Sequence, residues 1–514
     1  MSKAKQRKEF MQEFEFVKAS LTPAQGIFTL IALGLILLAL ANYVRVTLVK
    51  NTHDFVIAGR RLGFGFGVAG IISIWTWAMA VMMSSAMTYT YGTSGLWWFT
   101  VPNGLAVILI IPFARRLRAK MPHGYTIGEF ISSRFDGAGL ARVVMTAGLL
   151  FGALLAIIIN LKGTSLVIST VFGVDQGTVA IITAIIVLAY TVLGGLWASI
   201  STSTLTTLFI TVPTAFVVTA VLSQVGGAEF VWQTVASKST NFLSVARPEA
   251  AVGFGITLAL GLITATVVGQ DFWQVVWGLR EREVSRTFFW AGALFYPIPI
   301  CLGILGLVGI ALNVDLATHL NGDAAAVGPF VISHIGLPTW LILSYVFVIL
   351  SACYSTIDGS LSAISSIAAV DVIKPFSPNI PDHKLFSYTK LSMVLAALIA
   401  TLVVLSGVDF VTIVLTTYAI RTAVLIPFML AVFWDRMTAA GFFWGTVAAI
   451  AIGMPIHFAY GELPGSIAIL VISAIVPLVL GFQNQNRFDY DRLKKVADIS
   501  DDSAPVNPII PVNN

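Results

Sequence analysis

The sequence has 514 residues, of which 57% are hydrophobic and only 11% charged, with a formal net charge of +5. Because soluble globular domains carry about 25% charged residues, this composition excludes an ordinary water-soluble enzyme. The net positive charge comes largely from loop Lys and Arg, and no basic patch interleaved with aromatic residues indicates a nucleic-acid partner. The composition therefore predicts an integral membrane protein whose surroundings are the lipid bilayer.

Apolar runs of eighteen or more residues recur from Gly26 to Phe482. Each run is long enough to cross a hydrocarbon core of about 30 Å as a helix, and no polar stretch between the runs is long enough for a domain with its own core. We predict an all-α polytopic fold of about thirteen transmembrane helices, with an N-terminal segment at 1–25, a transporter domain at 26–483 and a tail at 484–514. The predicted spans are 26–48, 66–90, 95–113, 142–171, 178–199, 203–226, 251–277, 288–312, 338–370, 386–406, 409–434, 438–459 and 465–483.

Loop charges predict the orientation of these spans, because Lys and Arg mark the cytoplasmic side. The loops after the third, seventh and ninth spans are basic, whereas the loops after the fourth, eighth and tenth spans have no Lys or Arg. This alternation puts the C-terminus in the cytoplasm and the N-terminus outside, although the basic residues near the N-terminus favour the opposite. We expect a multi-pass protein of the cell (inner) membrane. The cytoplasmic markers are Arg115, Arg116, Arg118, Lys120, Arg134, Arg280, Arg282, Arg286, Lys374 and Lys384.

Two spans open with a similar glycine-rich pattern. The run GFGFGVAGIISIWTWA begins at Gly63, and VGFGITLALGLITATVVG begins at Val252, five spans later. Since five is odd, the two segments cross the membrane in opposite directions, as inverted-topology repeats require. Glycines that allow close helix packing explain the match about equally well. The repeats, if present, cover about 63–226 and 251–434.

The ninth predicted span is unusually polar for a membrane helix. Helical spacing puts Ala352, Ser355 and Thr356 on one face, so that one carbonyl and two hydroxyl oxygens converge there. Such neutral oxygens suit a small hard cation. The alternative is that the hydroxyls donate to carbonyls one turn earlier in the same helix, as Ser and Thr in membrane helices often do.

The second span carries Trp75 and Trp77 near its middle, after a glycine-rich beginning. At about 15 Å from the start of the span they lie too deep for an interfacial aromatic belt. A break in the helix here would free the carbonyls of Ser73 and Thr76, and freed carbonyls at the midplane are tolerated where they line an ion or substrate cavity.

Three motifs resemble hallmarks of the sodium/solute symporter family: FVIAGRRLG from Phe55, YTVLGGLWA from Tyr190, and STIDGSLSAISSIAAVDVIK from Ser355. The resemblance implies the LeuT-type fold of two inverted five-helix repeats, and sodium (Na+) as the coupling ion. Some members of this family hold a second sodium with an Asp where this chain has Ser203, which implies a single sodium. Carried over by motif position, the sodium ligands are the carbonyls of Ser73, Thr76 and Ala352 and the hydroxyls of Ser355 and Thr356.

Three further motifs, WTWA from Trp75, SSAMTYTYGTSGLWW from Ser84 and GQDFWQ from Gly269, resemble the urea-transporting branch of this family. That branch carries an acidic residue at the position of Gly269, and Asp271 lies two residues beyond it. We expect a small polar, urea-like solute between the indole faces and the polar groups of the second broken helix. The predicted substrate-binding residues are Trp75, Trp77, Gln270 and Asp271.

Ionisable residues within spans are functional candidates by default, because each is costly if it faces lipid. These residues are Asp358, Lys162, Asp271, Arg421 and His457. Lys162 and His457 have structural alternatives, either snorkelling or ordinary hydrogen bonding.

The favoured function is sodium-coupled symport of the solute by alternating access. The alternatives are proton coupling on the same fold, with Asp271 or Asp358 as carrier, and a solute sensor. The tail after Phe482 is too short for a kinase domain, which disfavours the sensor. No HExxH, G-x-S-x-G or Walker motif indicates an enzyme. The sequence leaves the oligomeric state open.

Overall fold

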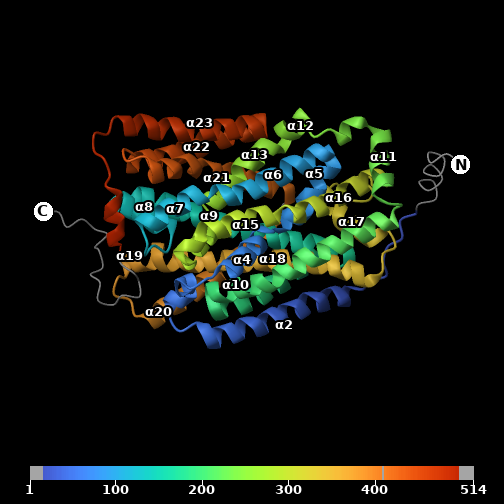
Figure 1. The fold of residues 1–514 in the computed structure, drawn as a ribbon, viewed down its shortest axis with the longest axis horizontal. Helices are drawn as coiled ribbons and strands as arrows, with labels where there is room; N and C mark the ends of the chain where they lie inside the picture. Colours follow the sequence, from blue (N-terminus) through green and yellow to red (C-terminus); the bar gives the residue numbers. More distant parts are fainter. Residues whose placement is uncertain (1–14, 408–409, 497–514) are drawn as a thin grey trace.

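The computed structural model describes residues 15–407 and 410–496, and over these ranges the chain forms a bundle of long helices running along a common axis (Figure 1). Two isolated backbone bridges are the only β pairings in this part of the chain. The helices of the bundle are α2 (Pro23–Leu48), α4 (Phe64–Trp75), α5 (Ala78–Tyr91), α6 (Thr93–Leu109), α7 (Ile111–Lys120), α9 (Gly139–Phe172), α10 (Gln176–Gln224), α13 (Ile256–Val267), α14 (Gln270–Gly278), α15 (Val284–Phe295), α16 (Pro297–Ala311), α18 (Thr339–Ile367), α20 (Asp382–Leu405), α21 (Phe410–Phe433), α22 (Ala439–Tyr460) and α23 (Glu462–Phe482).

Shorter helices connect the long ones. The connecting helices include α3 (Thr52–Ile57), α8 (Ile127–Arg134), α11 (Ala228–Lys238) and α17 (Val327–His334).

The number of membrane crossings follows from helix length and composition. Within the described ranges, eleven helices are long and apolar enough to cross a membrane, or up to twelve when the bent pair α4 and α5 is taken as one span. Helix α10 has 49 residues, about 74 Å at 1.5 Å per residue, which is more than twice the hydrocarbon thickness. It bends at Gly195 and therefore holds both of the spans predicted at 178–199 and 203–226. The predicted all-α polytopic architecture is confirmed.

The bend in α10 requires glycine. Gly195 has φ +52° and ψ −135°, a conformation that L side chains rarely adopt. A Cβ added there would lie 2.2 Å from the carbonyl oxygen of Phe55, closer than any real contact. The YTVLGGLWA motif therefore forms the bend at which α10 reverses direction. At this bend the chain packs against Phe55, in the segment before α4.

The two broken helices run in opposite directions. Helices α4 and α5 meet at 52° around Thr76 and Trp77, and α13 and α14 are separated at Val268 and Gly269. The amide of Leu62, just before α4, donates to the carbonyl of Gly278 at the end of α14 (3.0 Å). The beginning of α4 therefore lies next to the end of α14. The two broken helices cross the bundle in opposite directions, as an inverted repeat requires. The repeat limits near 63–226 and 251–434 stay a prediction.

Helix α18 occupies the interior of the bundle. In the most apolar stretch of Thr339–Phe376, which contains α18, 78% of the residues are buried. The corresponding shares are 39% for α2 and 33% for α23. Helices α2 and α23 lie at opposite edges of the bundle (Figure 1). Helix α18 packs against α4, α9 and α10, so its Ser and Thr side chains meet protein rather than lipid.

Candidate functional site

The break in the first broken helix is held by an amide from another helix. Thr76 and Trp77 leave the helical conformation, and the free N–H of Ala78, at the start of α5, donates to Oδ1 of Asn160 on α9 (2.7 Å). The Nδ2 of Asn160 donates to the carbonyl of Ala156 (2.8 Å), which fixes the orientation of the amide. Sequence reasoning missed Asn160, although a lone amide within an apolar span was a usable signal.

Two hydroxyls of α18 meet the end of α4 across the bundle. Ser355 Oγ donates to the carbonyl of Ser73 (2.9 Å), and Thr356 Oγ1 donates to the carbonyl of Ile74 (3.0 Å). Both hydroxyls also lie 3.0 Å from the carbonyl of Ala352, one turn earlier in α18. We call these five oxygens, from Ser73, Ile74, Ala352, Ser355 and Thr356, the candidate ion site.

The chemistry of the candidate ion site fits a hard monovalent cation. All five oxygens are neutral, and Ser73, Ser355 and Thr356 are at most 1% exposed. A hydroxyl has one proton, so Ser355 and Thr356 cannot fully satisfy two carbonyls each. Three carbonyls and two hydroxyls therefore keep oxygen lone pairs that a cation would satisfy. Both arrangements expected from the sequence therefore occur together: the Ser355 and Thr356 hydroxyls contact a carbonyl of their own helix and carbonyls of α4.

Four of the five predicted ion ligands, those from Ser73, Ala352, Ser355 and Thr356, converge. The fifth, the carbonyl of Thr76, stays a prediction; the N–H and the hydroxyl of Thr76 donate to the carbonyl of Ile72 (2.9 and 2.7 Å). Ile74 supplies the second carbonyl in contact with α18. Nothing in an isoleucine side chain signals this role, because only its backbone oxygen takes part.

A buried carboxylate lies one turn beyond the candidate ion site. Asp358 is fully buried and accepts hydrogen bonds from the hydroxyls of Ser199 and Thr202 on α10, the latter at 2.9 Å. Among the described residues it forms no ion pair. The hydroxyl of Ser203, at the position where an Asp is expected in some family members, is buried without a partner among the described residues. Because its hydrogen-bond donors are neutral, the buried carboxylate of Asp358 needs a proton or a nearby cation to balance its charge.

The predicted indole pair lies beside the second broken helix. The ring centroids of Trp75 and Trp77 are 6.2 Å apart, and the ring of Phe272 on α14 lies 5.2 Å from Trp75. Trp75 Nε1 donates to the carbonyl of Asn103 (3.2 Å), but Nε1 of Trp77 is buried with no acceptor in the described part of the chain. Among the described residues, the N–H of Trp77 is thus left without an acceptor, whereas that of Trp75 is engaged.

Gln270 is engaged by the protein. Its Nε2 donates to the carbonyl of Tyr125 (2.9 Å) and to Ser366 Oγ (3.3 Å), and its Oε1 accepts from the amide of Ile127 (3.2 Å). The side chain thus joins α14 to α18 and to the segment before α8. In this arrangement both polar atoms of the Gln270 amide are engaged by the protein.

Asp271 and Arg421 form the charged part of the predicted substrate region. Asp271 is half-buried at the start of α14 and interacts electrostatically with Arg421 of α21. Arg421 is 9% exposed; its Nη2 donates to the carbonyl of Ala265 (3.4 Å), and its Nη1 has no partner among the described residues. A buried guanidinium and a carboxylate at the break of α13 and α14 suit a polar solute with both donors and acceptors.

Lys162 and His457 have structural partners away from this region. Lys162 Nζ donates to Oε1 of Gln176 (3.1 Å), where α9 connects to α10. His457 Nε2 lies 3.6 Å from a carboxylate oxygen of Glu462, where α22 connects to α23. These contacts favour the structural alternative for both residues.

The FVIAGRRLG motif closes one end of the bundle. Arg60 donates to the carbonyl of Gly124 (3.0 Å) and lies over the ring of Tyr125 (4.9 Å). The amide of Tyr125 donates to Glu129 (2.9 Å), and Thr126 Oγ1 donates to Asp371 (2.8 Å). The pKa of Glu129 is raised to about 8, chiefly by burial; the nearby Asp371 contributes to the rise, and the Tyr125 N–H opposes it. At this end of the bundle, the carboxyl group of Glu129 therefore stays protonated at higher pH than an ordinary glutamate does.

Two broken helices, opposed in direction and packed on a buried helix, are typical of the LeuT-type fold of transport proteins. A substrate-bound, outward-open sodium-coupled sialic acid symporter has this fold, with a TM-score of 0.74 at 17% identity over 90% of this chain and 98% of that one. A nucleobase-cation-symport-1 family transporter matches with a TM-score of 0.56 at 13% identity, over 87% of this chain and 98% of that one. The chain belongs to the sodium:solute symporter family, whose pattern it matches over residues 55–449.

The relatives of this chain are named for different solutes and ions. A urea-proton symporter of Oryza sativa is 23% identical over 78% of this chain and 60% of its own length. A probable urea active transporter of Schizosaccharomyces pombe is 24% identical over 70% of this chain and 58% of its own length. A sodium/glucose cotransporter of Vibrio parahaemolyticus is 24% identical over 84% of both chains. The chain thus spans about 60% of the length of the two urea transporters.

Proposed function

We propose that this protein is a sodium-coupled symporter that imports a small polar, urea-like organic solute by alternating access. The observation that carries the proposal is the meeting of the Ser355 and Thr356 hydroxyls with carbonyls of α4. Sodium is a substrate here, bound by these hydroxyls, by the carbonyl of Ala352 and by carbonyls of the Ser73 to Thr76 segment. Sodium bound between α4 and α18 stabilises the conformation in which these helices are joined.

Coupling then follows from linkage and not from catalysis. An ion that binds one conformation more tightly shifts the population towards it, and the solute does the same in the same conformation. A cation crossing 100 mV supplies about 2.3 kcal/mol and a tenfold gradient about 1.4 kcal/mol more. Together these energies allow one sodium per solute to drive a roughly few-hundred-fold accumulation of a neutral solute.

The solute site of this proposal lies between Trp75, Trp77 and Asp271, with Gln270 at its end. An amide-like solute would stack on the indole faces, accept a hydrogen bond from Trp77 Nε1 and donate to the Asp271 carboxylate. Two relatives are named for urea, which supports the class of solute.

Proton coupling on the same fold is the second candidate. It is favoured by Asp358, a fully buried carboxylate with hydroxyl donors and no ion pair among the described residues. The relative from Oryza sativa is named a urea-proton symporter. Against this candidate stands the candidate ion site, whose hydroxyls and carbonyls do not titrate near pH 7.

Uptake by proteoliposomes separates the two candidates. A panel of labelled solutes that includes urea is tested with sodium and proton gradients imposed separately at clamped voltage. At fixed pH, flux should rise saturably with external sodium. Equal flux in choline buffer, accelerated by lowering external pH and lost in Asp358→Asn, would establish proton coupling instead.

We also propose that the chain lies in the cell (inner) membrane with its N-terminus outside and its C-terminus in the cytoplasm. Val17, near the first described residues, pairs with His334 and Ile335, whereas Tyr490 packs over Arg116 and Arg134 at the opposite end of the bundle (Figure 1). Basic residues at that second end favour the cytoplasm. An impermeant thiol reagent should label Ser244→Cys from outside intact cells and should not label Ser377→Cys; the reverse pattern would invert the topology.

A further inference from the structure

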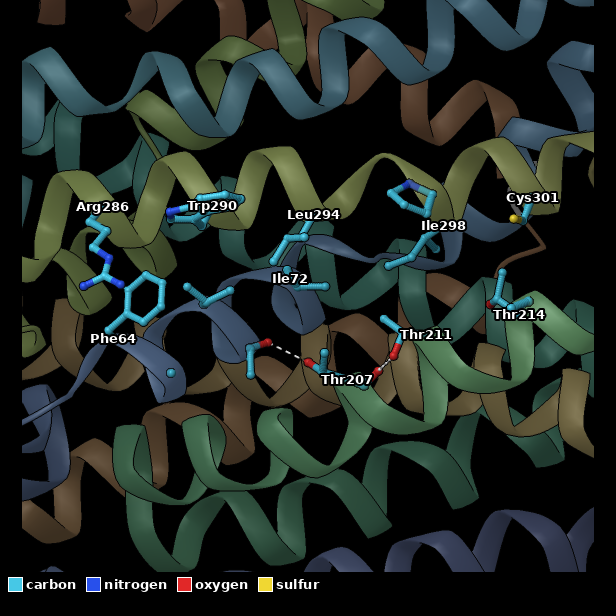
Figure 2. Close-up of a pocket in the computed structure, with 15 residues that line it drawn as sticks. Phe64, Ile72, Thr207, Thr211, Thr214, Arg286, Trp290, Leu294, Ile298 and Cys301 are labelled. Atoms are coloured by element: carbon cyan, nitrogen blue, oxygen red, sulfur yellow. Dashed lines mark hydrogen bonds between the residues drawn. The ribbon is translucent and has the colours of Figure 1, made fainter.

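A lateral groove of about 700 Å³ opens between α4, the second half of α10, and α15 with α16 (Figure 2). Part of its wall comes from the glycine-rich run that begins at Gly63, but no residue of the candidate ion site lines it, and neither do Trp77 and Asp271. Its volume is within the range of small-molecule sites in proteins. Trp290 and Leu294 on its wall are 44% and 49% exposed, so the groove faces the surroundings of the bundle.

The interior of the groove is effectively apolar, although three threonines line it. Thr207, Thr211 and Thr214 all direct their hydroxyls to backbone carbonyls of their own helix, at 2.6 to 2.8 Å. Thr207 also lies 2.7 Å from the carbonyl of Ala69 on α4. With these hydroxyls satisfied, the threonines present methyl groups, and the remaining lining is mostly aliphatic and aromatic. Water gains little by entering such a space, whereas an acyl chain suits it.

A single cation lies at one end of the groove. The guanidinium of Arg286 lies 4.2 Å from the ring centre of Phe64 at the start of α4 (Figure 2). Arg286 is exposed and forms no ion pair with the part of the chain that the structure describes. Its neighbour Arg282, in contrast, pairs with Glu283 at 3.4 Å. Arg286 therefore has donors free for an anion.

The position of Arg286 matches the depth of a lipid headgroup. It lies five residues into the span Glu281–Ala311, about 8 Å from its beginning. From Arg286 to Cys301, at the other end of the groove, fifteen residues of helix cover about 22 Å. Half of a hydrocarbon core is about 15 Å, so the groove accommodates one acyl chain of one leaflet.

We propose that this groove binds one anionic phospholipid, with an acyl chain along α10 and α16 and the phosphate on Arg286. Guanidinium and phosphate form paired hydrogen bonds, and a headgroup without a positive charge of its own leaves the lipid with a net negative charge that attracts a cation at this depth. The lipid lies against the outer side of α4, the helix that carries the Ser73 and Ile74 carbonyls.

Native mass spectrometry of the purified protein with phosphatidylglycerol or phosphatidylcholine of identical chains tests the proposal. The wild-type protein should retain one phosphatidylglycerol at least fivefold more strongly than phosphatidylcholine. Arg286→Gln should abolish this preference, and Arg282→Gln, which removes a charge four residues earlier in the chain, should keep it. Ala215→Phe, which fills the groove at an exposed small residue, should reduce retention of both lipids. Equal retention of the two lipids by wild type, or a preference unchanged in Arg286→Gln, overturns the site.

A measurement on the unmutated protein guards against misfolded variants. The chain has two cysteines; Cys301 lines the groove, and Cys353 is fully buried. Alkylation of Cys301 by a membrane-permeant maleimide in nanodiscs should slow at least threefold when phosphatidylglycerol replaces phosphatidylcholine. An equal rate in both lipids contradicts the proposal.

Discussion

Thr356 Oγ1 of α18 lies 3.0 Å from the carbonyl of Ile74, in the last turn of α4 before the helix breaks. A side chain near the middle of one span thus contacts a backbone oxygen 282 positions earlier in the chain. This contact crosses from the broken helix to the buried helix, so any ion bound there depends on both.

Removal of the Thr356 or Ser355 hydroxyl should weaken sodium activation of transport. Each deletion to Ala takes away one oxygen ligand, and a hydrogen bond or ligand to a charged group is worth about 1.5–3 kcal/mol. The half-saturating sodium concentration should therefore rise by about tenfold or more in each variant. Uptake at fixed voltage across a sodium series provides the measurement.

Two further variants serve as controls for this prediction. Thr356→Ser keeps the hydroxyl and should keep sodium affinity within about threefold of wild type. This change is smaller than the change expected when one oxygen ligand is lost. Ser365→Ala deletes a hydroxyl of the same helix that bonds only within α18, and should leave sodium affinity unchanged. Intact transport with unaltered sodium affinity in both Ala variants would remove α18 from the ion site.

Gln270 and Asp271 are adjacent in sequence but should respond differently to substitution. Gln270→Ala removes the hydrogen bonds to the Tyr125 carbonyl and from the Ile127 amide, at about 1–3 kcal/mol each, so its main effect should be a lower melting temperature. Asp271→Asn should raise the substrate half-saturation concentration about tenfold, because one hydrogen bond between the solute and a charged group is lost. Thermal unfolding and uptake are measured on both variants.

Trp77→Ala completes this test of the solute site, because the indole N–H has no partner in the described protein. A substrate half-saturation concentration within twofold of wild type in both Trp77→Ala and Asp271→Asn would place the solute elsewhere.

Gly195→Ala should be severely destabilising. The new methyl group meets the Phe55 carbonyl at 2.2 Å while φ stays at +52°, so strain and overpacking act together, at about 3 kcal/mol or more. Gly173→Ala is the matched control, since Gly173 also has positive φ (+70°) but has open space around it. Its cost should be only the backbone strain of about 1–2 kcal/mol. Melting temperatures in detergent rank the two; similar values would contradict the clash.

Glu129 should make stability fall with rising pH. In the unfolded chain its carboxyl ionises near 4.5, whereas the folded pKa is about 8, so the folded state holds the proton more tightly. The stabilisation is complete below pH 4.5, declines as pH rises towards 8, and amounts to about 2–4 kcal/mol at most for a partly exposed side chain.

Glu129→Gln cannot ionise and should therefore unfold at similar temperatures at pH 5 and pH 9. The exposed Glu229 provides the control, because Glu229→Gln should keep the pH dependence of wild type. An equal loss of melting temperature between pH 5 and pH 9 in wild type and Glu129→Gln would rule out Glu129 as the titrating group.

Features that are local in the chain determine the membrane architecture. Apolar runs of spanning length follow from the energetics of burying a helix in hydrocarbon, so their limits are readable residue by residue. The three family motifs fall at the loop before α4, at the bend of α10 and on α18, the places where glycine geometry and hydroxyl chemistry constrain residue type. For the same reason, Ser355 and Thr356 are recognisable from the sequence as candidate ion ligands.

Only the tertiary structure decided which partners these residues meet. The Ile74 carbonyl enters the candidate ion site because α4 ends one residue later, and a backbone oxygen leaves no trace in side-chain identity. Asn160 caps α5 from a different helix, and Gln270 turns to Tyr125 and Ile127, both through pairings of residues 82 to 145 positions apart. The sequence by itself determined the spans, the breaks and the kind of oxygen available. The fold decided which oxygens converge, because convergence depends on how helices distant in sequence pack against one another.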